Sequence, residues 1–108
     1  GSTSGITQVT GTANVFVGHA ADGAAGNTNT VAIGQNAKST ASSNVVVGQG
    51  ASDAGFSNVV ALGQGATANA ANQVVIGSGV SVTATADIPV TNYINVNIGG
   101  TVYKLLLG

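Results

Sequence analysis

The sequence predicts an all-β protein built as a parallel β-solenoid, because a phrase of the form apolar–x–apolar–Gly recurs five times. The glycines that end these phrases are separated by 16, 14, 15 and 14 residues. A unit of this length cannot bury a core alone, so it must stack on its neighbours. No segment has the apolar spacing of a helix. We therefore expect about five coils of 14–16 residues over residues 13–86. The phrase-ending glycines are Gly18, Gly34, Gly48, Gly63 and Gly77.

Each coil is expected to contain two short strands joined by two tight corners, and the phrase itself is the first strand. Two residues after the glycine come residues that tolerate a left-handed backbone, which predicts a turn at Ala20, Asn36, Gly50, Gly65 and Gly79. The second strand is predicted to begin one residue later, at Ala21, Ala37, Ala51, Ala66 and Val80. Small residues predict the second corner at Ala25, Ala41, Gly55, Ala70 and Ala84.

The alternation within the phrase predicts which side chains fill the coil. In a strand the first and third residues point one way and the middle residue points the other way. We expect the outer pair to form the coil core, which would consist of Val15, Val17, Val31, Ile33, Val45, Val47, Val60, Leu62, Val74 and Ile76. The middle residues would then form an apolar stripe on the outside, which is typical of an association surface. This stripe would consist of Phe16, Ala32, Val46, Ala61 and Val75.

Polar residues also recur in register. Gln35, Gln49 and Gln64 follow their glycines directly, so they should stack as an amide ladder. A second ladder is predicted from Asn29, Asn58 and Asn72, which lie two residues before their phrases. Asp22 and Lys38 share a column on adjacent coils.

The two ends of the chain depart from the repeat. Gly99-Gly100 lies between two alternating runs and predicts a β-hairpin within residues 87–108, after a junction at Asp87-Ile88-Pro89. An isolated hairpin is marginal in water. Three hairpins around an axis, or one hairpin laid on the end of the roll, would bury one apolar face of the hairpin and cap the stack. The predicted cap residues are Ile94, Val96, Ile98, Tyr103 and Leu105. Residues 1–12 are expected to be an expression scar at Gly1-Ser2 followed by a partial coil.

Composition argues against several functions. Two lysines and a net charge of −1 do not suit nucleic acid, and no apolar run is long enough to span a bilayer. With one histidine, no cysteine and no glutamate, we expect no enzyme, no metal and no cofactor. Gly63–Ala68 fits a dinucleotide fingerprint, but it is one rung among five and no helix is expected after it. His19 is expected to be a solvated corner residue, although three copies could meet on a trimer axis.

Several phrases resemble the head repeats of trimeric autotransporter adhesins of the YadA type, which are also found in bacteriophage tail fibres. The resemblance rests on Asn29–Ala37 and Asn58–Ala66, with close matches around Val45 and Val74. It implies a left-handed parallel β-roll, a homotrimer with the apolar stripe as its interface, and attachment on an outer surface. The expected location is an extracellular surface or a virion-associated fibre.

The leading hypothesis is a non-enzymatic trimeric fibre module that attaches to a glycan or protein of a host surface. Its contacts would come from outward loops, namely Asn27, Thr28, Ser42, Ser43, Phe56 and Ser57. For Phe56, packing against a neighbouring subunit is the alternative. A structural spacer or trimerising tip without a ligand is the alternative function. An ice-binding solenoid is a third class, but the threonines fall in different columns.

Overall fold

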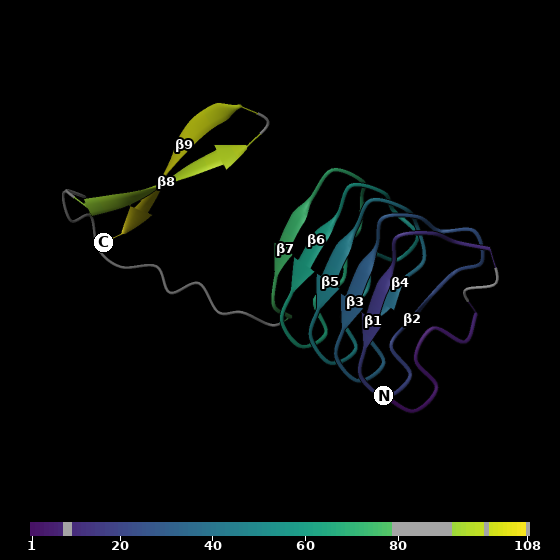
Figure 1. The fold of residues 1–108 in the computed structure, drawn as a ribbon. Coiled ribbons are helices and arrows are strands. Elements are labelled where there is room, and N and C mark those ends of the chain that lie inside the picture. Colours follow the sequence, from purple (N-terminus) through teal and green to yellow (C-terminus); the bar gives the residue numbers. More distant parts are fainter. Residues whose placement is uncertain (8–9, 79–91, 99, 108) are drawn as a thin grey trace.

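The computed structural model describes residues 1–7, 10–78, 92–98 and 100–107. Five strands of three residues lie side by side in one parallel sheet, in chain order (Figure 1). Successive phrases pair position for position, as in Val31 with Val45 and Ile33 with Val47. The result is an all-β parallel solenoid, as predicted, with about four turns where about five coils were expected, and the described residues include no helix. The strands are β1 (Val15–Val17), β3 (Val31–Ile33), β5 (Val45–Val47), β6 (Val60–Leu62) and β7 (Val74–Ile76).

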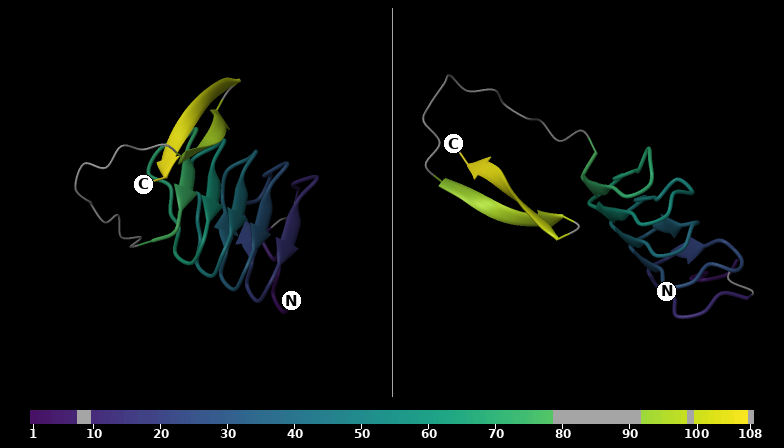
Figure 2. Two further views of the ribbon diagram at one scale, coloured as in Figure 1. Left: turned by 90° about the vertical axis from the view of Figure 1, so that its left-hand side faces the viewer. Right: turned by 90° about the horizontal axis from the view of Figure 1, so that it is seen from above.

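A second, shorter parallel sheet forms the opposite wall of the coil (Figure 2). It pairs β2 (Asp22–Gly23) with β4 (Lys38–Ser39), and single bridges continue it from Lys38 to Ser52 and on to Thr67. Asp22 pairs with Lys38, so the predicted column is confirmed. The predicted second strand forms in the first two coils and is reduced to one bridge residue in the next two, in each case one residue after the alanine that was expected to begin it. Val80 lies outside the described residues.

The first corner follows the prediction. Ala20, Asn36, Gly50 and Gly65 all adopt the left-handed backbone, with φ between 55° and 66°. The residue at this corner donates its N–H to the preceding coil, as in Asn36 to the carbonyl of His19 at 2.9 Å. Short side chains that tolerate positive φ therefore mark this corner in the sequence. Gly79 lies outside the described residues.

The phrase-ending glycines are required because neighbouring coils touch through their backbones. Gly48 has a φ of 142°, and a Cβ atom there would lie 2.3 Å from the carbonyl oxygen of Gly63. The backbone of Gly63 is held by its own hydrogen bond to Val47, at 2.8 Å, and has little freedom to move away. The sequence repeats glycine at this position because no side chain fits between the rungs.

The structure reverses the expected facing of the phrase strands. Ala32, Val46 and Ala61 are fully buried inside the coil, and Phe16 and Val75 pack against this core at its two ends. These five residues were predicted to be the outer stripe and trimer interface, and that prediction is wrong. The predicted coil core instead faces outward: Val15, Val17, Val45, Leu62, Val74 and Ile76 are exposed, and Val31, Ile33, Val47 and Val60 are half-buried.

The physical reason is the narrow space between the two walls. The second wall contributes a column of fully buried alanines, namely Ala21, Ala37, Ala51 and Ala66. Most of the core cluster is alanine, and Val46 and Val59 are its largest members that are fully buried. An interior this thin accepts small side chains, so the larger valine, isoleucine and leucine pairs are directed outward.

The second corner absorbs all the variation in coil length. The chain turns or bends at Ala25, Ala41, Gly55 and Ala70, as predicted, and Ala84 lies outside the described residues. Each corner ends on a residue with φ between 57° and 65°, namely Asn29, Ser43, Asn58 or Asn72. The residues between the second wall and that position number five, three, four and three in successive coils, at 24–28, 40–42, 54–57 and 69–71.

Residues 1–7 form a partial turn on the first coil. Ser2 accepts a hydrogen bond from the N–H of Ala20 at 3.1 Å, and Gly5 donates to the carbonyl of Ala21 at 2.9 Å. Thr3 has a φ of 61°, which matches the first corner of the later coils. These contacts stack residues 1–7 on the first coil, and the assignment of residues 1–12 to an expression scar and a partial coil stays a prediction.

The described C-terminal residues form the predicted hairpin, in which β8 (Asn92–Ile98) pairs antiparallel with β9 (Thr101–Leu107). Ile94 pairs with Leu105 and Val96 pairs with Tyr103, as predicted from the Gly-Gly turn. Gly100 has a φ of 87°, and its N–H donates to Asn97 Oδ1 at 3.0 Å. The role of this hairpin as a cap stays a prediction, and the junction at 87–89 and the Ile98 side chain lie outside the described part.

Candidate functional site

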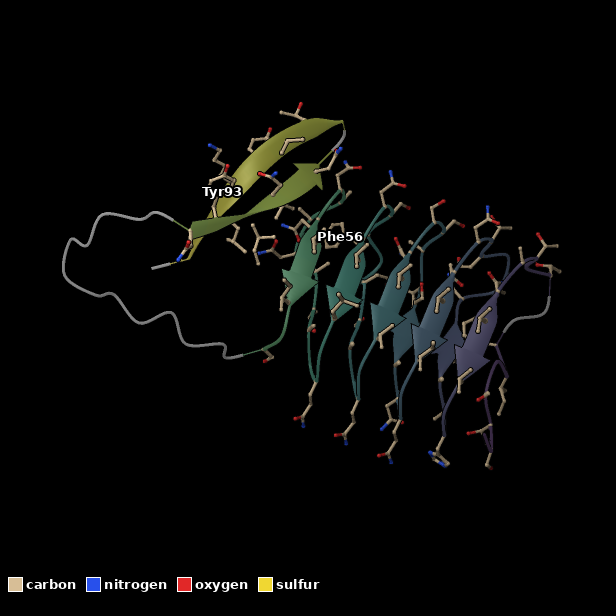
Figure 3. All side chains as sticks on the ribbon, turned by 60° about the vertical axis from the view of Figure 1, so that its left-hand side comes forward. Phe56 and Tyr93 are labelled. Carbon is tan, nitrogen blue, oxygen red and sulfur yellow. The ribbon has the colours of Figure 1, made fainter. Side chains whose placement is uncertain are left out.

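The strongest candidate site is the outward face of the five-stranded sheet, which we call the outer apolar face. Every residue in its two columns is valine, isoleucine or leucine, and the exposed fraction reaches 71% at Ile76. Figure 3 shows side chains standing along this sheet from β1 to β7. The face consists of Val15, Val31, Val45, Val60 and Val74 in one column and Val17, Ile33, Val47, Leu62 and Ile76 in the other.

Amide side chains border this face on both sides. Gln64 Nε2 donates to Gln49 Oε1 at 3.4 Å on the side where the strands end. Asn58 Nδ2 donates to Asn72 Oδ1 at 3.1 Å on the side where they begin. The predicted ladders are thus confirmed at these two pairs. An apolar centre with a polar rim is the usual anatomy of a protein interface.

The predicted ligand-facing loops are only partly exposed. Asn27 is buried and its Nδ2 donates to the carbonyl of Ser39 at 2.9 Å, so its assignment to an outward loop is wrong. The amide turns inward because it satisfies a backbone carbonyl that would otherwise be buried without a partner. Thr28 and Ser42 are half-buried and bond to each other at 3.1 Å, from N–H to Oγ. Ser43, Phe56 and Ser57 are exposed.

Phe56 combines an exposed ring with a fixed backbone (Figure 3). The residue is 36% exposed. Its N–H donates to the carbonyl of Asp53 at 3.0 Å, and its own carbonyl accepts from Asn44 Nδ2 at 2.8 Å. A rigidly presented aromatic ring is suited to contact with a partner.

Asp53 is a fully buried carboxylate that fastens the second corner of two coils. One oxygen, Oδ1, accepts from the Thr40 N–H and hydroxyl at 3.0 and 2.9 Å and from the Gly55 N–H at 3.0 Å. The other, Oδ2, accepts from the Ala41 N–H at 2.9 Å, from Asn44 Nδ2 at 2.5 Å and from the Ser39 hydroxyl at 3.1 Å. These six donors compensate the removal of the charge from water.

Asn44, which is buried, and Asn14, which is half-buried, link adjacent coils in a similar way. Asn44 Oδ1 accepts from the Val59 N–H at 2.8 Å, and Asn14 Oδ1 accepts from the Thr30 N–H at 3.0 Å. Asn14 Nδ2 donates to the carbonyl of Asn27 at 2.8 Å, which matches the bond from Asn44 to Phe56. In each case the side-chain oxygen of asparagine, instead of a backbone carbonyl, accepts the backbone N–H just before the next phrase strand.

Burial by itself raises the pKa of the Asp53 carboxyl. Hydrogen bonds from the N–H groups of Gly55, Ala41 and Thr40 and from the Thr40 hydroxyl outweigh it, so the pKa lies below its ordinary value of 3.8. A carboxyl whose pKa is lowered by folding stabilises the folded state above its unfolded pKa. It loses that contribution as the pH falls through the folded pKa.

We expect Asp53→Asn to destabilise the fold at neutral pH and to weaken its loss of stability in acid. The amide nitrogen would face donors in place of an acceptor, at a cost of about 2–4 kcal/mol. Thermal melts from pH 7 to below the ordinary aspartate pKa would measure both effects. Asp22→Asn is the matched control, because Asp22 is only half-buried and accepts from the N–H groups of Thr7 and Gly23. An equal loss of melting temperature in both variants at neutral pH would contradict the role given to Asp53.

Other kinds of site find no support in the described part of the chain. It contains no pocket and no group of three or more histidine, cysteine or acidic residues. His19 is exposed at the first corner, in the column of the glutamines. Within the described ranges, no helix is long and apolar enough to cross a membrane.

No family model matches the chain, and comparisons with curated proteins and with solved structures found no match.

The outer apolar face was missed in the sequence although a signal was present. Alanine occupies the middle of two phrases and never an outer position. The small residue lies where two walls approach each other, and the large residues lie where space is unrestricted. Asp53 had no comparable signal, because its partners come from two coils and share no motif.

Proposed function

We propose that this chain is the subunit of a non-enzymatic trimeric fibre module, of the phage tail-fibre or bacterial surface-adhesin type, that attaches to a host surface. Three left-handed rolls would stand side by side, with the hairpins capping one end. The module would belong to an extracellular surface or to a virion-associated fibre. The single observation that supports this proposal best is the outer apolar face with its amide rims.

Self-association accounts for this face better than contact with an unrelated partner. It carries no charged group, so identical copies can meet without repulsion. It is only one three-residue strand wide, which is about 7–10 Å at the rise of a strand. A strip this narrow is suited to convergence around a shared axis. Copies with the same polarity would then place equivalent turns at equal heights, so valine columns would meet valine columns.

Attachment would use the surface that points away from the axis. Exposed Ser43, Phe56 and Ser57 lie at the second corner, and three copies would present them together. Multiple weak contacts then add to a useful avidity. The target, a glycan or a protein of the host surface, would need no enzymatic chemistry from this chain.

The solution mass tests the assembly. Light scattering on a sizing column should give three times the 10.3 kDa of one chain, and a folded monomer would contradict the proposal.

We expect Leu62→Asp to give a folded chain that no longer assembles. Leu62 is exposed on the outer apolar face, and burying an unpaired carboxylate between subunits costs several kcal/mol. The control is Thr67→Asp, which adds the same charge to the same turn on the second wall, where Thr67 is exposed. Mass and far-ultraviolet circular dichroism should separate the two variants. A trimeric Leu62→Asp would show that this face is not the interface.

A structural spacer is the second candidate function, and the small, mostly uncharged residues of the second corner favour it. Its residues are mostly alanine, serine, threonine and asparagine, with Phe56 as the one aromatic ring among those described. Binding of the labelled protein to glycan arrays and to cells would separate the functions. A trimer that binds nothing in either assay would support the spacer.

A further inference from the structure

The hairpin of β8 and β9 is a two-stranded sheet that pairs only with itself among the described strands. Its strands are seven residues each and match in register from Asn92 with Leu107 to Ile98 with Thr101. Isolated hairpins are marginally stable in water at best, and a third strand or a packed face is normally needed. Because the hairpin is long and regularly paired, we expect one of its faces to be packed against another part of the protein.

The two faces of the hairpin differ in what they offer. One carries Asn95, Asn97 and Lys104, and Lys104 Nζ lies 4.3 Å from the centre of the Tyr93 ring. Tyr93 stands on the hairpin in Figure 3. Lys104 and the asparagines suit contact with water, although Val102, which pairs with Asn97, is also exposed on this face.

The opposite face is apolar and uncovered. It presents Ile94 and Val96, which alternate with asparagines along β8, and Tyr103 and Leu105, which flank Lys104 in β9. Tyr103 is 54% exposed and Leu105 is 56% exposed. Both are exposed well beyond what a stable sheet face shows in water. We call this set the apolar hairpin face.

We propose that two further copies of this chain cover the apolar hairpin face, with three hairpins meeting around the trimer axis and clamping the assembly. This inference rests on the proposed trimer. It goes further, because it assigns a large share of the association to the hairpin and not to the roll. It also decides between three hairpins on an axis and one hairpin laid on its own roll.

Area is the first argument for other copies. The outer apolar face spans five strands at about 4.8 Å and is about 7–10 Å wide, so its projected area is on the order of 200 Å². Stable interfaces bury about 800 Å² per partner. A seven-residue hairpin is about 23 Å long and two strands wide, which roughly doubles the apolar area available.

Continuity and charge are the second argument. Copies that associate in the same direction through their rolls carry their C-terminal segments to the same end of the assembly. The apolar hairpin face contains no charged side chain, and Lys104 belongs to the other face. Three such faces can therefore meet without burying a charge.

The tyrosines provide a direct readout. Tyr93 and Tyr103 are the two tyrosines of the chain, both lie in the hairpin, and there is no tryptophan. The near-ultraviolet tyrosine signal therefore reports on the hairpin, while the far-ultraviolet signal reports on the whole β-structure. On dilution of the full chain we expect the tyrosine signal and the mass to fall together. A tyrosine signal that stays constant while the mass falls would show a hairpin held by its own chain and would overturn the inference.

Leu105→Asp is the decisive variant. We expect it to need at least about tenfold more protein for assembly than the wild type, and to lose tyrosine signal at intermediate concentrations. Asn95→Asp is the control, because it adds the same charge to the opposite face, beside Lys104. If Leu105→Asp assembles like the wild type, the clamp is wrong and the trimeric module stands. If the wild type is monomeric at every concentration, both fail.

Discussion

Replacing Ala61 by aspartate should abolish folding of the roll. Ala61 is 0% exposed in the middle of β6 and belongs to the alanine-rich core between the two walls. An aspartate there would need both space and hydrogen-bond partners, and its burial without them costs several kcal/mol. Single domains are stable by only about 5–15 kcal/mol. Circular dichroism and thermal melting of the purified variant would show the loss of cooperative unfolding.

Leu62→Asp is the matched control for this result, because it changes the next residue of the same strand. Leu62 is 39% exposed, so the variant should retain the β-signal and a cooperative melt even where it no longer assembles. The pair tests the facing of the strands directly. A folded Ala61→Asp beside an unfolded Leu62→Asp would restore the facing expected from the alternation within the phrase and refute the observed one.

Gly48→Ala should destabilise the roll by about 3–5 kcal/mol, because it combines backbone strain with a contact that cannot relax. The added Cβ would lie 2.3 Å from the carbonyl oxygen and 2.5 Å from the carbonyl carbon of Gly63. Both atoms belong to the rigid ladder of the next coil. Chemical denaturation with the slope held common to both proteins would measure the loss.

Gly50→Ala is the control, two residues away at the first corner. Its φ is 65° and nothing lies within 4 Å of the added Cβ. Ala20 occupies the equivalent corner with a φ of 55°. The expected loss is about 1–2 kcal/mol, the ordinary cost of a left-handed alanine. Equal losses for the two variants would mean that close backbone approach is not what selects glycine at the end of the phrase.

The repeat itself could be predicted from the sequence because each signal is local. The phrase gave the strand bounds, since three-residue strands fit between a left-handed corner and a glycine. The register followed from Gly34, Gly48 and Gly63, and the hairpin pairing followed from Gly99-Gly100. These features depend on backbone sterics, which residue type records directly.

The facing of the strands could not be predicted from hydrophobicity, because both sides of each phrase are apolar. The deciding quantity was the distance between the two walls, which depends on the alanine column of a different strand. The Asp53 site had the same difficulty, since its donors come from Ser39, Thr40, Ala41, Asn44 and Gly55. Such sites are assembled by stacking, and no stretch of sequence contains them.

Because only the second corner varies in length, each coil consists of a part with a fixed number of residues and a part whose number of residues can change. Within either strand of a coil, one inserted residue would turn the following side chains of that strand to the other face. Between residues 24 and 28 the chain is already two residues longer than at 40–42, and the strands on both sides keep their register. Surface variation can therefore accumulate at this corner at little cost to the stack. A foreign peptide inserted at Ala25-Gly26 would be displayed on the roll without changing how its rungs align.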